Sequence, residues 1–234
     1  MITNKIICTI CARGGSKRLK NKNLLLIKKL PLIAHTIQQA KKTKIFDVVS
    51  VSSDSKKLLD ISRKFGADVL IKRDRNLSND SASKLLAIKD CVIKTEKQKK
   101  IKYDFIVDLD VTSPLRKIID IKNCIKKIIK SKKSNIFSVT DAKHSPYFNM
   151  VEIKKNKVKI SKNYKSNKIN RMQDSPEIYE MNASIYVWNR NIFIKNPKII
   201  YFDTMYYKMP RERSIDIDTK LDYQTVKFLS KKSY

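Results

Sequence analysis

The chain has 234 residues, 41% of them hydrophobic, so it can bury a substantial core and is not expected to be disordered. No apolar run approaches the roughly 18 to 20 residues that span a bilayer, and no signal-peptide pattern precedes the first strand-like segment. We therefore expect a soluble, cytoplasmic protein without a membrane partner. The formal net charge is +30, but lysines are scattered over nearly every expected helix, which favours solvated faces over a specific nucleic-acid-binding surface.

Apolar segments and helix-like patterns alternate along the first 141 residues. Such alternation is typical of a parallel sheet that helices cover on both faces. The second expected helix has Ser55 as a candidate N-cap and Gly66 as a stop signal. The pattern predicts a doubly wound, three-layer α/β fold with a mostly parallel sheet. Its expected strands are 5–12, 47–54, 68–72, 103–111 and 135–141, and its expected helices are 31–44, 55–67, 81–98 and 118–133.

Residues 142–181 interrupt this alternation. A β-hairpin turning at 155–157 is followed by a polar, irregular segment, which predicts a small excursion from the core. Strands at 182–189 and 198–204 and a closing helix at 218–232 return the chain to the core. We expect one domain over residues 1–234.

The stretch CARGGSKRLKNKN follows the first expected strand and holds two of the three glycines of the chain, Gly14 and Gly15. In open α/β sheets the first strand-to-helix loop is the usual phosphate cradle. Glycines let backbone N–H groups approach a phosphate, and Arg13, Lys17 and Lys22 supply positive charge for a polyphosphate. The stretch matches neither GxGxxG nor the P-loop pattern, so a dehydrogenase and a P-loop NTPase are disfavoured.

Two Asp-x-Asp pairs are the other chemical feature. Asp108 and Asp110 end an expected strand, and Asp216 and Asp218 lie in SIDIDT; each spacing places both carboxylates on one face of an extended segment. Paired carboxylates suit Mg²⁺, which binds one or two of them together with phosphate oxygens. Purely structural roles remain open, because Asp218 could cap the closing helix and Asp108 could pair with a lysine.

Six motifs in order resemble those of the acylneuraminate cytidylyltransferases, the CMP-sialic acid synthetases, from about residue 4 to the end. They are ARGGSKRLKNKN (12–23), VSSDS (51–55), RDRNLSNDSAS (73–83), TSPLR (112–116), NASIYV (182–187) and SIDIDTKLD (214–222). VDLDVTSPLR, HSPYFNMVEI and QDSPEIYEMNASIYVW are similar to the bacterial branch that activates legionaminic and related nonulosonic acids. The resemblance implies a Rossmann-like fold of the nucleotide-diphospho-sugar transferase type and a homodimer formed through 142–181.

The resemblance also implies the reaction. The anomeric hydroxyl of a nine-carbon 2-keto sugar acid would attack the α-phosphate of CTP, releasing pyrophosphate, with Mg²⁺ bridging phosphates and no covalent enzyme intermediate. Arg13, Lys17 and Asp218 would be catalytic, and Asp218 or a metal-bound hydroxide would help to deprotonate the hydroxyl. The implied binding residues are Arg13, Ser16, Lys17, Lys22, Asn23 and Arg73 for the nucleotide, Asp216 and Asp218 for the metal, and Asp110, Arg171 and Tyr186 for the sugar.

Four positions depart from the residues common in the sialic acid enzymes: Arg18 replaces glycine, Lys84 serine, Asp110 glutamine and Met172 a second arginine. We therefore expect a sugar other than N-acetylneuraminic acid, and the resemblance to the bacterial branch implies one of legionaminic type. Three alternatives stay open at this point. They are a 3-deoxy-octulosonate cytidylyltransferase, a glycosyltransferase that uses Asp108 and Asp110 as a metal motif, and a basic nucleic-acid-binding protein.

Overall fold

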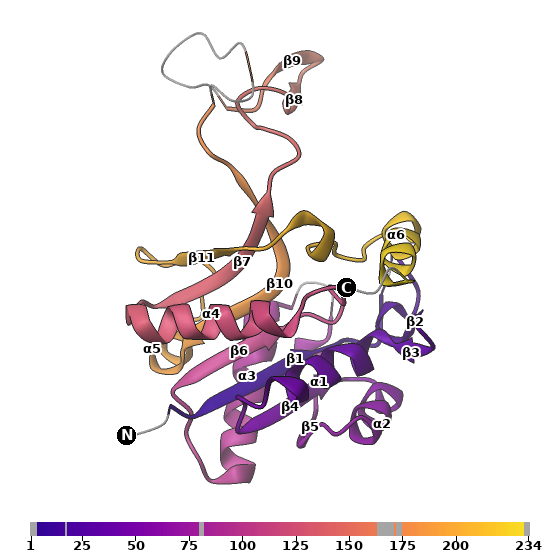
Figure 1. Ribbon diagram of the computed structural model, residues 1–234, viewed down its shortest axis with the longest axis vertical. Helices are drawn as coiled ribbons and strands as arrows, with labels where there is room; N and C mark the ends of the chain where they lie inside the picture. Colours follow the sequence, from indigo (N-terminus) through magenta and orange to yellow (C-terminus); the bar gives the residue numbers. More distant parts are fainter. Residues whose placement is uncertain (1–3, 17, 80–81, 163–170, 172–174, 232–234) are drawn as a thin grey trace.

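The computed structural model describes residues 4–16, 18–79, 82–162, 171 and 175–231 (Figure 1). Their centre is a seven-stranded sheet in which β10 runs antiparallel to both of its neighbours and the remaining pairs are parallel. The predicted mostly parallel sheet is confirmed. Its strands, in spatial order, are β11 (Met205–Lys208), β7 (Asn135–Asp141), β10 (Tyr179–Asn189), β6 (Phe105–Leu109), β1 (Ile6–Cys11), β4 (Val48–Ser53) and β5 (Val69–Lys72).

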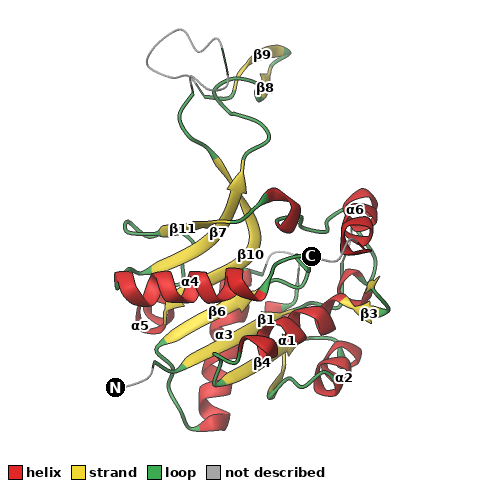
Figure 2. Ribbon diagram, in the orientation of Figure 1, coloured by secondary structure: helices red, strands yellow, loops and turns green. Residues whose placement is uncertain are grey.

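Helices cover both faces of the sheet and complete three layers (Figure 2). A buried cluster that includes Ile33, Ile37 and Ile121 lies between the sheet and the helices on one face, which we call the first face. A second cluster, which includes Ile88 and Trp188, lies on the other face. The first face carries α1 (Leu32–Thr43), α2 (Lys56–Lys64), α4 (Ile118–Ser131) and α6 (Lys220–Lys231), and the second carries α3 (Lys84–Lys99) and α5 (Arg190–Lys195). No helix within the described ranges is long and apolar enough to cross a bilayer.

The predicted excursion contains the expected hairpin, β8 (Val151–Lys154) and β9 (Lys157–Ile160). Its turn residues Lys155 and Asn156 both have positive φ, as a two-residue hairpin turn of type I′ requires. Strands β7 and β10 lead from the sheet to this projecting hairpin, which we call the arm (residues 142–162 and 175–181 of the described chain; Figure 1).

The predicted strand 198–204 is wrong. These residues form a loop closed by a hydrogen bond from the Tyr201 amide to Thr204 Oγ1 (2.6 Å), with Phe202 fully exposed. The strand that pairs with β7 is β11, which begins at Met205. A short ribbon, β2 (Leu26–Ile27) with β3 (Leu30–Pro31), was not predicted from the sequence.

The order of strands positions the functional site. The chain passes from β1 to β4 and β5 on one side and then places β6 on the other side of β1. The strand order therefore reverses between β1 and β6, whose carboxyl ends lie side by side. In open α/β sheets ligands bind beyond the carboxyl ends of the strands at such a reversal.

Candidate active site

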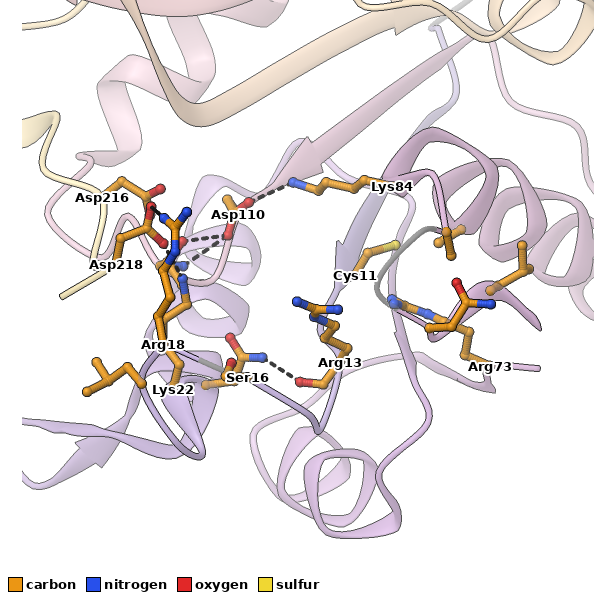
Figure 3. Close-up of a pocket in the computed structure, with 17 residues that line it drawn as sticks. Cys11, Arg13, Ser16, Arg18, Lys22, Arg73, Lys84, Asp110, Asp216 and Asp218 are labelled. Carbon is orange, nitrogen blue, oxygen red and sulfur yellow. Dashed lines mark hydrogen bonds and ion pairs between the residues drawn. The ribbon is translucent and has the colours of Figure 1, made fainter. Parts of the chain in front are cut away.

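A cavity of about 600 Å³ opens at the carboxyl ends of β1 and β6 (Figure 3). Arg18 and Lys22 lie beside Asp216 and Asp218 on one side, and Lys84 and Arg73 lie on the other. The lining residues come from the end of β1 and the loop after it, from the segment between β5 and α3 and the start of α3, and from the loops after β6 and before α6. They are Cys11, Arg13, Ser16, Arg18, Leu19, Lys22, Asn23, Arg73, Leu77, Asn79, Ala82, Lys84, Ala87, Asp110, Thr112, Asp216 and Asp218.

Most of the predicted site residues meet in this cavity. Arg13, Ser16, Lys22, Asn23, Arg73, Asp110, Asp216 and Asp218 line it. Lys17 lies outside the described residues. Arg171 is exposed and does not line the cavity. Tyr186 does not line it either, but its ring lies behind Lys84, with the ring centroid 5.5 Å from Lys84 Nζ.

Internal hydrogen bonds hold the loop after β1 in place. The Gly14 amide donates to Asp54 Oδ1 (2.7 Å), and Asn23 Nδ2 donates to the Arg13 carbonyl (2.9 Å). Arg73 is similarly anchored, because its guanidinium donates to Ser52 Oγ and to the Ser52 carbonyl. Asn23 and Arg73 therefore line the cavity and also make hydrogen bonds that hold its wall in place.

Asp218, one of the two carboxylates before α6, does not cap this helix. The prediction that Asp218 could cap α6 is wrong, because Thr219 does so in a capping box with Asp222. The Ile217 amide donates to the Thr112 carbonyl (3.0 Å), which fixes Asp216 and Asp218 beside the end of β6.

The two carboxylates have different surroundings. Asp218 pairs with Lys22 (2.8 Å) and with Arg18 (3.6 Å). Asp216 Oδ1 is buried and has no hydrogen-bond partner within the described chain. Burial, followed by the nearby charge of Asp110, raises the pKa of Asp216. This part of the cavity therefore favours a cation next to Asp216.

The other structural alternative, an Asp108 to lysine pair, is confirmed. Lys84 Nζ lies 3.0 Å from Asp108 Oδ2 and 2.6 Å from Asp110 Oδ2. Burial alone would raise the pKa of Asp110, but Lys84 and the donors of Thr112 hold it well below its usual range. Burial raises the pKa of Asp108, although Lys84 opposes the shift.

The family model described as cytidylyltransferase matches residues 7–233. The chain belongs to the cytidylyltransferase family. A CMP-N,N'-diacetyllegionaminic acid synthase of Campylobacter jejuni is 39% identical over 96% of this chain and 94% of its own length. The post-translational flagellin modification protein B of Campylobacter coli is 36% identical over 97% of this chain and 96% of its own. The predicted resemblance is confirmed.

Solved structures agree on the fold of this cytidylyltransferase. A CMP:2-keto-3-deoxy-manno-octonic acid synthetase complexed with CTP superposes with a TM-score of 0.69 at 16% identity, covering 98% of this chain and all of the other. A 4-diphosphocytidyl-2C-methyl-D-erythritol synthase gives a TM-score of 0.69 at 10% identity, covering 97% and 99%. At these identities the likeness establishes the shared fold only, which confirms the predicted Rossmann-like class.

Sequence reasoning did not assign several lining residues of the cytidylyltransferase to the site. Arg18 and Lys84 stood out only as departures from the family pattern. Cys11 was expected to be a reduced thiol that packs in the core, and Thr112 was given no role of its own. The available signal was position. Cys11 ends β1, and Thr112 follows Asp110 by two residues, so both lie at carboxyl ends of central strands.

The two adjacent glycines of the cytidylyltransferase make a matched pair of variants. A Cβ on Gly14 would lie 2.9 Å from Ser55 Cβ, whereas a Cβ on Gly15 would meet nothing within 4 Å. We expect Gly14→Ala to displace the loop that carries Arg13, because two carbons cannot approach so closely. CTP affinity, measured by calorimetry, should fall about tenfold or more in Gly14→Ala. It should change little in Gly15→Ala, and equal losses in both variants would contradict this account.

Proposed function

We propose that this cytidylyltransferase transfers the CMP group of CTP to a nonulosonic acid of legionaminic type. The hydroxyl at the anomeric carbon forms a bond to the α-phosphorus, the bond between the α-phosphorus and the α,β-bridging oxygen breaks, and pyrophosphate leaves. The hydroxyl proton passes to a base, for which Asp218 is the candidate in this cavity. One observation carries the proposal: a basic glycine-containing loop meets Asp216 and Asp218 in one cavity at the carboxyl ends of β1 and β6. The substrate class is supported by the relative named as a diacetyllegionaminic acid synthase, which is 39% identical over 96% of this chain.

The charges in the cavity suit a triphosphate. Arg13, Arg18 and Lys22 would hold the β- and γ-phosphates and neutralise the pyrophosphate as it leaves, since negative charge grows on it in the transition state. Leu77, Ala82 and Ala87 follow Arg73 in the chain and offer apolar surface to the cavity, against which the nucleoside would lie. Such positioning and charge stabilisation supply the catalysis in an in-line displacement that forms no covalent enzyme intermediate.

The surroundings of Asp216 and Asp218 fit Mg²⁺. Asp216 Oδ1 is a buried oxygen without a hydrogen-bond partner in the described chain, and Asp218 is its neighbour in the same cavity. The described residues contain no group of three or more His, Cys, Asp or Glu side chains placed to hold a metal. Two carboxylates suffice for Mg²⁺ when substrate phosphates complete its oxygen shell. When bound, the ion would neutralise charge on the phosphates.

The test is pyrophosphate release with Mg²⁺, each of the four nucleoside triphosphates, and a panel of legionaminic, pseudaminic, N-acetylneuraminic and 3-deoxy-octulosonic acids. We expect turnover with CTP and a nine-carbon acid of legionaminic type. Turnover with 3-deoxy-octulosonic acid instead would move the activity to that shorter substrate. No release with any pair, from folded protein, would refute cytidylyl transfer.

A homodimer through the arm is part of the proposal. The arm exposes large apolar side chains, Ile153 by 72% and Val158 by 66%, on the facing strands of its hairpin. Single exposed hydrophobic residues are ordinary, but such a group on a projecting element is typical of an interface. We expect a dimer by light scattering and a monomer for Ile153→Asp with Val158→Asp. A monomeric unsubstituted protein would contradict the prediction.

Three further expectations stay predictions: that Arg171 contacts the sugar, that Lys17 contacts a phosphate, and that the protein is cytoplasmic.

A further inference from the structure

The two aspartates of the Asp108-Leu109-Asp110 motif, which the proposed metal and phosphate contacts do not use, both contact the ammonium group of Lys84. Asp108 is completely buried on β6, below the cavity, and Asp110 lies at the cavity wall. Lys84 comes from the first turn of α3 and reaches toward Asp110 from the opposite wall (Figure 3). Its Nζ contacts one carboxylate oxygen of each aspartate, at 3.0 and 2.6 Å.

The remaining oxygens of the pair are already satisfied. Asp108 Oδ1 accepts from Thr9 Oγ1 (2.9 Å), and Asp110 Oδ1 accepts from the Thr112 amide and hydroxyl. Asp108 Oδ2 receives no hydrogen bond of good geometry from the described residues, so Lys84 is the positive charge beside it. Asp108 Oδ2 and Asp110 Oδ2 thus point at the same position, and the ammonium group of Lys84 occupies it.

A pair of carboxylate oxygens converging on one point is what a divalent cation such as Mg²⁺ or Mn²⁺ binds. We propose that Lys84 is a built-in substitute for a metal ion: its ammonium fills a cation site formed by Asp108 and Asp110 and keeps divalent ions out of it. Asp108 and Asp110 are then positioning residues for Lys84. The motif that suggested a metal-dependent glycosyltransferase holds a fixed lysine charge instead.

For the reaction, this arrangement supplies one permanent positive charge at the end of β6. The Lys84 side chain lines the cavity and is 42% exposed, so its charge lies within reach of an anionic substrate bound there. A permanent charge needs no ion from solution. This step rests on the proposed function, whereas the filling of the cation site by Lys84 does not.

The test uses Mn²⁺ alone, without nucleotide, and counts bound ions from the electron paramagnetic resonance signal of free Mn²⁺ up to about 1 mM. We expect Lys84→Ala to bind one more Mn²⁺ per chain than the unsubstituted protein, because removal of the ammonium leaves both oxygens open. The added ion should be lost again in Lys84→Ala with Asp110→Asn. Lys84→Arg, which keeps the charge, should bind no added ion.

A matched control is Lys97→Met, which removes one positive charge from the exposed last turn of the same helix and should bind no added ion. Folding of each variant is checked by circular dichroism. Folded Lys84→Ala with unchanged stoichiometry would overturn the proposal. If Lys84→Ala does not fold, the unsubstituted protein and Asp110→Asn decide: equal stoichiometry supports the filled site, and loss of an ion in Asp110→Asn overturns it. None of these outcomes depends on cytidylyl transfer.

Discussion

Asp216→Asn should lower kcat for pyrophosphate release by about 10²- to 10⁴-fold, the range that loss of several kcal/mol of transition-state stabilisation produces. Asparagine keeps the size of the side chain but replaces an anionic oxygen with a neutral amide. The raised pKa of Asp216, caused by burial and by Asp110, indicates that this carboxylate lies where negative charge is costly without a cation. The substitution should therefore weaken the proposed Mg²⁺ site directly. Steady-state rates at saturating CTP and sugar acid measure the effect.

Asp218→Asn separates metal binding from phosphate binding. Asp218 pairs with Lys22 and Arg18, so its loss releases two cations toward the phosphates while removing a proposed metal ligand. We expect kcat to fall by about 10²-fold or more without a rise in the KM for CTP. Asp60→Asn, on the exposed side of α2, is the control and should leave both constants unchanged. Rates within threefold of the unsubstituted enzyme in both site variants would exclude Asp216 and Asp218 as catalytic metal ligands.

The fold could be predicted because periodicity follows burial in this chain. Strands β1 and β6 are buried over nearly their whole length and read as mostly apolar runs between helical patterns. Strand β4 is also buried, and its valines and small serines (VVSVSS) favour a strand in the same way. The strand predicted at 198–204 is wrong because apolar composition does not follow burial there. The run KIIYF is apolar, but Ile200 and Phe202 are exposed and a turn at Tyr201 interrupts it. Composition alone does not distinguish an exposed apolar loop from a strand.

The site could be predicted where its residues belong to one local motif. Arg13, Lys22 and Asn23 follow a strand in the first loop, where phosphate sites are common. The choice between roles for the aspartate pairs needed tertiary contacts. Whether Asp108 pairs with a lysine depends on how the first turn of α3 meets the end of β6, 24 residues later in the chain. Thr219, one residue after Asp218, decides the cap of α6.

Arg116, the arginine of the TSPLR motif, should be required for stability, since the structure places it away from the cavity. Its side chain is buried, and its guanidinium donates to the carbonyl of Ser184 and to the carbonyl of Asp110. It also donates to Thr36 Oγ1 (3.1 Å) and Gln39 Oε1 (2.9 Å) on α1. One planar group therefore joins α1, β10 and the loop after β6.

Arg116→Met should lower the free energy of unfolding by about 3–5 kcal/mol, because methionine fills the space but leaves several buried acceptors without donors. Burial lowers the pKa of Arg116 to about 10, so at neutral pH its charge remains in place and strengthens the bonds to these carbonyls. Arg116→Lys keeps the charge but loses the fork geometry, and we expect an intermediate loss. Urea unfolding measures both variants, with an unchanged m-value as the sign that stability alone has changed. A loss below about 1 kcal/mol in Arg116→Met would mean that other donors or water replace the guanidinium, and the motif arginine would then need a role at the cavity.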